Sequence, residues 1–205
     1  MIKRGQELLA KAVEAFGKLD QLRSFQKTDV RENQVKNTLT LAFPDAWRQE
    51  TVRPNFTLVS VVTPADSFVV FNKAARPMPE ANRAALNKEL QHELLVLLRA
   101  RTRSDFKVSL AGGGNVAVEL PGFVTTLAID PASGRVLSQT YRGRGPGGVV
   151  GQIVINYSDY RTVEGLSLPF KTTATFDGQP FPALSATSEG VTVNGQIDPS
   201  SFKKP

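Results

Sequence analysis

A long series of short, strand-like runs separated by turn residues constrains this chain more than any other feature. The run VKNTLTLAF, residues 35–43, alternates Leu39, Leu41 and Phe43 with smaller or polar residues, a period of two that is typical of a half-buried strand. Further β-branched and aromatic runs occupy residues 56–62 and 67–71, and the turn-forming TPAD lies between them. The pattern predicts a meander of antiparallel strands.

Two amphipathic patterns interrupt the strands. Residues 5–20 carry apolar side chains on one helical face and stop near Gly17, and residues 79–103 predict one long helix. Strand patterns then resume almost to the end of the chain. Because strands and helices do not alternate as βαβ units, we expect an α+β fold with one antiparallel sheet and a single domain of residues 1–205. The long helix is expected to present one leucine face, formed by Leu86, Leu90, Leu94, Leu97 and Leu98.

Composition excludes several classes of site. The 205 residues contain no cysteine, which rules out disulfides, thiolate zinc sites and cysteine nucleophiles in this chain. The net charge of +6 would favour anionic surfaces, but the basic residues are scattered and lack interleaved aromatics, so we expect no nucleic-acid partner. The first residues lack the apolar core of a signal peptide, and no apolar run reaches a membrane-spanning length.

The stretch YRGRGPGG, residues 141–148, contains a literal G-x-G-x-x-G, and Glu164 follows at roughly the distance of a ribose-binding acid. A dinucleotide site needs a helix directly after the glycines. Valine and isoleucine dominate residues 149–155, which favours a strand there. We therefore predict that residues 149–160 are a strand, that the glycines form a hairpin loop, and that no cofactor is bound.

Candidate catalytic groups are few. The single histidine, His92, falls in the predicted long helix off its leucine face and is expected to be solvated. No G-x-S-x-G motif accompanies it, and no ligand-spaced cluster suggests a metal site. We expect no catalytic residue and no enzyme activity. The carboxylates available for an acid–base pair are explained by polar turns and strands: Glu119, Asp159, Glu164 and Asp177.

Apolar side chains are the remaining feature. The strands between residues 39 and 71 are rich in aromatics, and the predicted long helix offers leucines against them. One interpretation is an ordinary core between sheet and helix. The other is a curved sheet whose concave face holds an apolar ligand, with the helix as plug or lid. The second predicts a cavity lined by Leu39, Leu41, Phe43, Trp47, Phe56, Leu58, Phe68, Val70, Leu90 and Leu94.

The segment SDYRTVEGLSLPFKTTATFDGQPF, residues 158–181, resembles a strand pair of the LolA-like outer-membrane lipoprotein-sorting superfamily. The matching residues begin with Asp159, Tyr160 and Arg161 and end with Leu168 and Pro169. The first helix AKAVEAFGKLDQLRSFQ, the upstream strand–turn–strand element LAIDPASGRVLSQTYRG and the ending VTVNGQIDPSSFKKP are similar to further elements of these proteins and occur in the same order.

The resemblance implies a strongly curved antiparallel half-barrel, an incomplete β-barrel, with helices over its concave, apolar face. It also implies a periplasmic or cell-envelope protein that carries an acyl chain, lipid or lipoprotein and touches the membrane surface only transiently, with an envelope protein as a further expected partner. A similar ending occurs in domains attached to insulinase-type zinc peptidases. The alternative is therefore a non-catalytic structural or interaction domain of such a peptidase, since H-x-x-E-H is absent here.

Overall fold

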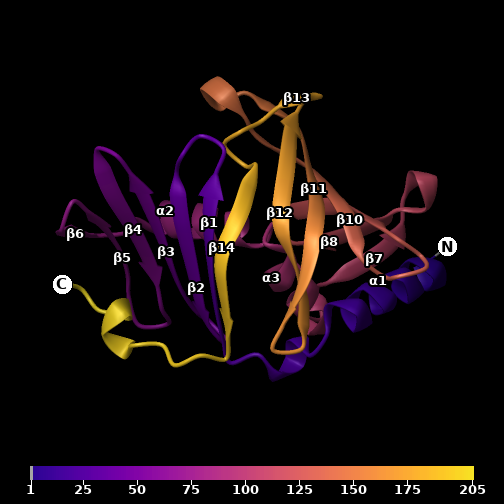
Figure 1. Cartoon of the computed structure of the whole chain (residues 1–205), viewed down its shortest axis with the longest axis horizontal. Helices are drawn as coiled ribbons and strands as arrows, with labels where there is room; N and C mark the ends of the chain where they lie inside the picture. Colours follow the sequence, from indigo (N-terminus) through magenta and orange to yellow (C-terminus); the bar gives the residue numbers. More distant parts are fainter. Residues whose placement is uncertain (1) are drawn as a thin grey trace. The chain divides into compact units, whose positions relative to one another are not determined.

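The computed structural model describes residues 2–205, which form fourteen strands, three α-helices and five short 3-10 helices (Figure 1). The chain divides into two compact units that are interleaved in sequence. Unit 1 contains the residues through Asp20 together with Gln91–Ser185, and unit 2 contains Gln21–Leu90 together with Ala186–Pro205.

Unit 2 is an antiparallel sheet with strand order β6-β5-β4-β3-β2-β1-β14. The first six strands are joined in sequence, whereas β14 arrives from the end of the chain and pairs with β1, placing Val193 opposite Phe25. The elements of unit 2 are β1 (Ser24–Arg31), β2 (Lys36–Ala42), β3 (Ala46–Arg53), β4 (Phe56–Val62), β5 (Ser67–Phe71), β6 (Ala74–Pro77), α2 (Glu80–Leu90), β14 (Ala186–Val193) and η5 (Pro199–Phe202).

The two faces of this sheet differ, because side chains alternate along each strand. Trp47 lies opposite Leu41 on β2 and Val62 on β4, so these apolar residues share one face, which we call the Trp47 face. Helix α2 is on that face, since Trp47 Nε1 donates a 2.8 Å hydrogen bond to Asn87 Oδ1. The opposite face, the Arg48 face, carries the intervening side chains of the same strands.

Unit 1 has the strand order β12-β11-β10-β9-β8-β7, with β13 added to β12. Neighbouring strands in this order are antiparallel. Its elements are α1 (Ile2–Phe16), α3 (Leu94–Arg99), η2 (Ala100–Thr102), β7 (Lys107–Leu110), η3 (Gly112–Gly114), β8 (Val116–Leu120), β9 (Phe123–Ile129), β10 (Val136–Arg144), η4 (Pro146–Gly148), β11 (Val150–Val163), β12 (Leu166–Phe176) and β13 (Gln179–Pro180), while η1 (Leu19–Gln21) spans the sequence boundary between the units.

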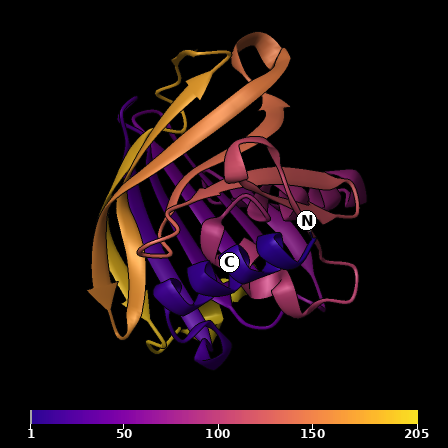
Figure 2. The same ribbon diagram turned by 90° about the vertical axis from the view of Figure 1, so that its right-hand side faces the viewer.

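Helix α1 packs across β7, β8 and β9 and also reaches β12 (Figure 2). Leu9, Ala12 and Phe16 are buried at one helical spacing, as the sequence pattern predicts. The helix ends at Phe16, and Gly17 follows it with a φ of +103°, which suits glycine. A Cβ at Gly17 would clash with the carbonyl oxygen of Gly165.

The predicted strand after the glycine loop is confirmed: β11 runs from Val150 to Val163 and pairs with β10. The stretch YRGRGPGG is therefore a hairpin connection. No helix begins at its glycines beyond the single turn of η4.

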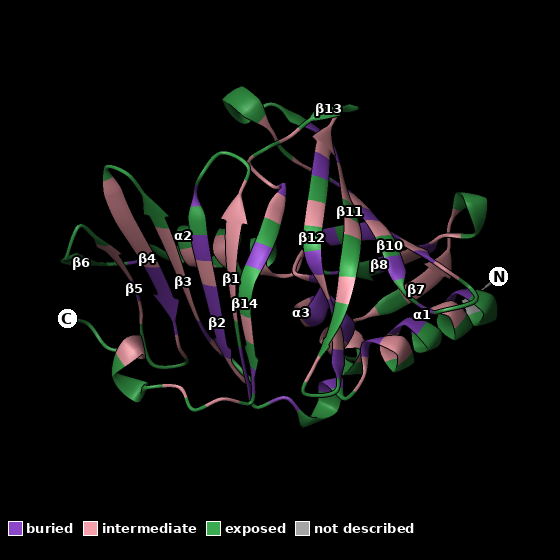
Figure 3. Cartoon of the chain, viewed as in Figure 1, coloured by how far each residue is buried: buried purple, intermediate pink, exposed green. Residues whose placement is uncertain are grey.

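The predicted single helix over residues 79–103 is wrong. It breaks at residues 91–93 into α2 and α3, which belong to different units. Helix α2 has no buried residue, whereas Leu94, Leu95, Leu97 and Leu98 of α3 are all buried (Figure 3). The leucines keep the same spacing whether these residues form one helix or two. Tertiary packing, and not the local sequence pattern, therefore determines where the helix breaks.

Across residues 2–205, the helices are too short or too polar to cross a membrane.

Candidate functional site

The chain after β14 returns across the Arg48 face of unit 2 and encloses a groove there. Asp198 caps the N-terminus of η5, because its carboxylate accepts a 2.8 Å hydrogen bond from the Ser200 backbone N–H. Pro199 occupies the first helical position. The groove between this segment and β3–β5 has a volume of about 530 Å³. It is lined by Arg48, Thr57, Val59, Val61, Phe68, Val70, Asn72, Lys73, Ser201, Lys203 and Pro205.

The floor of the groove is apolar and regular. Val61 lies opposite Phe68, and Val59 lies opposite Val70, so these four side chains form two rungs of the β4–β5 pair. Val61 and Phe68 are each only 1% exposed, which fixes the deeper rung firmly in the sheet. An apolar floor of this kind suits the hydrocarbon part of a ligand.

The polar lining of the groove is basic. Arg48, Lys73 and Lys203 line it, and its lining contains no aspartate or glutamate. The guanidinium of Arg48 forms a 2.7 Å ion pair with Glu50, in which the side chains are 20% and 32% exposed. Lys73 sits in the tight β5–β6 turn at a positive φ of 73°, beyond the opposite end of the floor from Arg48.

Two charged contacts fix the returning segment. Lys204 Nζ lies 2.8 Å from Asp66 Oδ2 and 5.7 Å from the Phe68 ring centroid. The hydrogen bond from Lys204 lowers the pKa of Asp66, and the hydroxyl of Ser200 lowers the pKa of Asp198. Both carboxylates are therefore held in their charged form at neutral pH.

A second, smaller hollow of about 180 Å³ lies on the same face and shares Arg48 and Ser201 with the groove. Hydroxyl and amide groups dominate its lining, and within it Gln26 Nε2 donates a 3.0 Å hydrogen bond to Thr40. The two hollows therefore form an apolar compartment and a polar compartment that meet at Arg48 and Ser201. The polar hollow is lined by Ser24, Phe25, Gln26, Thr40, Arg48, Thr192, Gly195, Gln196, Ile197, Asp198 and Ser201.

The residues expected to line an apolar cavity are distributed over both faces. Phe68 and Val70 line the groove, but the pairing registers place Leu39, Leu41, Trp47 and Leu58 on the Trp47 face. Phe56 is half-buried beside Phe71, with ring centroids 5.5 Å apart, and Phe43 follows the end of β2. Leu90 ends α2, and Leu94 belongs to unit 1.

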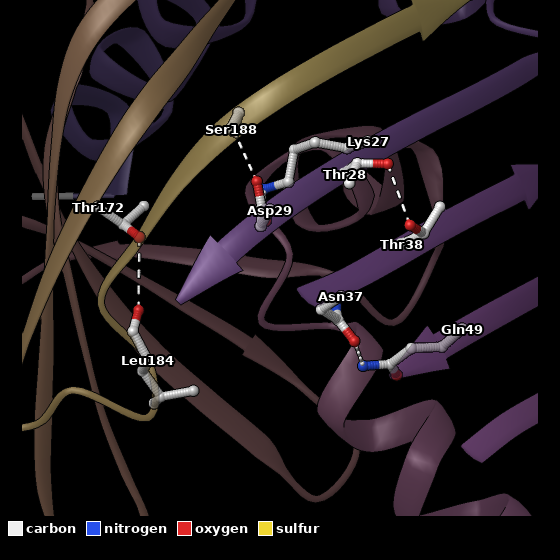
Figure 4. A network of polar contacts seen from close by, with 9 residues as sticks. All are labelled: Lys27, Thr28, Asp29, Asn37, Thr38, Gln49, Thr172, Leu184 and Ser188. Atoms are coloured by element: carbon white, nitrogen blue, oxygen red, sulfur yellow. Dashed lines mark hydrogen bonds and ion pairs between the residues drawn. The ribbon is translucent and has the colours of Figure 1, made fainter. Parts of the chain in front are cut away.

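The Trp47 face is itself polar at one end. Lys27 and Asp29 form a 2.9 Å ion pair, and Ser188 donates a 2.6 Å hydrogen bond to Asp29 (Figure 4). Beside them, Gln49 donates a 3.0 Å hydrogen bond to Asn37. In unit 2 the Trp47 face therefore combines apolar residues with a hydrogen-bonded polar group on β1, β2, β3 and β14.

Nine of the eleven lining residues were not predicted from the sequence: Arg48, Thr57, Val59, Val61, Asn72, Lys73, Ser201, Lys203 and Pro205. Alternation in FTLVSVV indicates that Val59 and Val61 share a face with each other. No local pattern indicates that the end of the chain returns to cover that face.

Unit 1 does not bring the candidate catalytic groups together. Asp159 is paired with Arg161 at 2.6 Å, which lowers the pKa of Asp159, and Glu164 lies in the β11–β12 turn. Asp177 accepts a 2.8 Å hydrogen bond from the Gln152 backbone, and Glu119 is on β8, three strands from β11 in the sheet order. Within residues 2–205, no group of histidines and carboxylates could hold a metal ion.

The expectation of a solvated His92 is wrong. Its ring stacks on Tyr141 at 3.7 Å between centroids and lies 4.7 Å from Phe123. The break between α2 and α3 allows this packing, because His92 lies in the connecting turn and not within a helix.

The open, antiparallel strand orders and the three α-helices of residues 2–205 form a LolA-like α+β fold. A LolA superfamily protein from Nitrosomonas europaea matches with a TM-score of 0.55 and 12% identity, over 97% of each chain. A DUF1329 family protein from Desulfovibrio piger matches with a TM-score of 0.58 and 9% identity, over 98% of this chain and 97% of that one.

No protein-family profile matches the sequence, and no curated protein matches it either. At 9% and 12% identity the structural likeness shows the fold alone. It confirms the expected LolA-like fold class, while the single domain of residues 1–205 and the cavity residues remain predictions.

Proposed function

We propose that the chain is a non-enzymatic, LolA-like binding protein that holds an acyl chain or another apolar part of a lipid or lipoprotein. The observation that carries the proposal is the groove on the Arg48 face, with its floor of Val59, Val61, Phe68 and Val70. This face is opposite helix α2, whereas the sequence led us to expect the ligand on the face that the helices cover. Its volume of about 530 Å³ is in the range of ligand pockets. Each methylene buried there contributes about 0.8 kcal/mol, so a long chain binds without a charged partner.

We further propose that this protein works in the periplasm or cell envelope, carrying its ligand in transport toward the outer membrane, and that its contact with a membrane surface is transient. The β10–β11 loop supports such contact. Val149 and Val150 are 60% and 54% exposed at its end, and the exposed Arg142 and Arg144 precede it on β10. Exposed apolar residues next to arginines suit an anionic lipid surface.

Two neighbouring valines on β5 give a matched test of the groove. Val70 lines it, whereas Val69 is equally half-buried but points to the Trp47 face. We expect Val70→Gln to weaken binding of a fluorescent fatty acid clearly and Val69→Gln to weaken it little. Thermal unfolding of both variants checks that they are folded to the same extent.

Two outcomes would contradict these expectations. If the purified wild-type protein takes up no fluorescent fatty acid, and solvent extracts contain no co-purified lipid by mass spectrometry, the proposed function is wrong. If Val69→Gln abolishes binding and Val70→Gln does not, the ligand lies on the Trp47 face.

A further inference from the structure

The two compartments on the Arg48 face differ in chemistry where they meet. The larger one has the apolar floor, and the smaller one is lined mainly by hydroxyl and amide groups. Arg48 and Ser201 line both. A ligand that fills both compartments must therefore be apolar at one end and polar at the other.

Two cationic side chains lie at this junction, and Asp198 of the polar hollow is the one carboxylate in the lining of the two compartments. Arg48 and Lys203 both line the groove, whose lining includes no carboxylate. Glu50 engages one nitrogen of the Arg48 guanidinium, which has further N–H donors. Lys203 interacts electrostatically with Asp198, a carboxylate that Ser200 already engages through its hydroxyl and its backbone N–H.

We infer that the groove takes single-chain amphiphiles with an anionic head, the tail lying on the valine floor and the carboxylate or phosphate lying beside Arg48 and Lys203. This inference rests on the proposed function and adds the chemical class and orientation of its ligand. A polar remainder of the head, such as glycerol, occupies the small hollow, where Gln26 and Thr40 offer hydrogen bonds. A few convergent polar groups at the end of an apolar pocket commonly orient a ligand in this way.

The orientation also follows from the spacing of the rungs. Arg48 lies opposite Val61, whereas Thr57, which lines the groove near Lys73, is four residues before Val61 on β4. At about 3.3 Å per residue the two ends of the floor are roughly 13 Å apart. Only the Arg48 end adjoins the polar hollow, and the head therefore belongs at that end.

Three ligands with the same oleoyl chain test this inference by calorimetric titration below their micellar concentrations. Monoolein is uncharged, oleate carries a carboxylate, and oleoyl lysophosphatidylglycerol carries a phosphate with a glycerol. We expect the wild-type protein to bind at least one of the two anionic ligands about tenfold or more tightly than monoolein, because hydrogen bonds to a charged group are stronger than those to a neutral one. A preference for oleate alone would identify a ligand with a carboxylate head. A preference for the lysolipid alone would identify a ligand with a phosphate head.

Lys203→Gln should remove most of that preference. Lys88→Gln, on the exposed surface of α2, is the matched control and should leave the preference intact. Equal affinity for all three ligands would overturn the inference that the ligand has an anionic head. Equal effects of the two substitutions would overturn it as well. If monoolein still binds in that case, the proposed function remains supported. If none of the three ligands binds, the proposed function and this inference are both refuted.

Discussion

Trp47 on β3 and Asn87 on α2 are joined by a 2.8 Å hydrogen bond from the indole N–H to the amide oxygen. Trp47 is 4% exposed, whereas α2 has no buried residue. The helix therefore has little apolar burial of its own, and this bond is a main attachment to the Trp47 face.

We expect Asn87→Ala to leave the buried indole N–H without its partner and to loosen α2, at a cost of about 1–3 kcal/mol. Hydrogen exchange of the α2 amides should become faster, and the fluorescence of the only tryptophan should change. Asn82→Ala, at an exposed position of the same helix, serves as the control. Unchanged exchange in Asn87→Ala would show that α2 is held by other contacts.

Half-buried Tyr157 and buried Gln139 form a polar pair in unit 1. The phenol donates a 2.7 Å hydrogen bond to Gln139 Oε1, the glutamine is fully buried, and burial raises the pKa of Tyr157. We expect Tyr157→Phe and Gln139→Leu each to destabilise unit 1 by about 1–3 kcal/mol, because each leaves a buried polar group unpaired. The double variant should lose much less than the sum, as urea unfolding can measure. Additive losses would mean that the two groups are not coupled.

Acid should release the segment that covers the groove. The pKa values of Asp66 and Asp198 are lowered in the folded protein, so their contribution is present above the ordinary carboxyl pKa of 3.8 and is lost as the pH falls through the lowered values. We expect hydrogen exchange in residues 199–204 to accelerate, relative to the intrinsic rate, as the pH drops below about 4. In Asp66→Asn/Asp198→Asn the protection should already be low at pH 7 and nearly independent of pH. A wild-type segment that stays equally protected at pH 3 would contradict this explanation.

Gly17 should tolerate no side chain. A Cβ there would lie 2.1 Å from the Gly165 carbonyl oxygen, at a φ of +103°. Gly147 is also at positive φ, but a Cβ there meets nothing within 4 Å. We expect Gly147→Ala to cost about 1 kcal/mol and Gly17→Ala clearly more, because only the second adds a clash to the strain. Thermal or urea unfolding can compare the two, and equal losses would show that the backbone around Gly17 yields easily.

Local chemistry predicted the strands and their turns well. The β-branched residues after the glycine loop identified β11, and Glu164-Gly165 and Asp177-Gly178 are indeed tight turns with positive φ at both residues. The helix break at residues 91–93 could not be predicted, because the leucines on either side keep one period while packing in different units.

The site was only half predictable for a related reason. Alternation shows which side chains share a face, as it does for Phe68 and Val70, but it does not say what covers that face. The groove depends on contacts such as Lys204 with Asp66, which join residues 138 positions apart. No sequence window contains such a pair.

The interleaving of the two units has a consequence for how the protein can be made. Unit 2 receives its strand β14 only after the whole of residues 91–185 has been synthesised, and α1 must wait for β7–β9 before it can pack. Neither unit can complete its fold from the first half of the chain, and neither can be cut out as one continuous fragment. Pairing of such distant segments is slow, and strand β1 has an open edge that can pair wrongly until β14 binds to it. Folding helpers that shield this edge would therefore act before β14 has paired with β1.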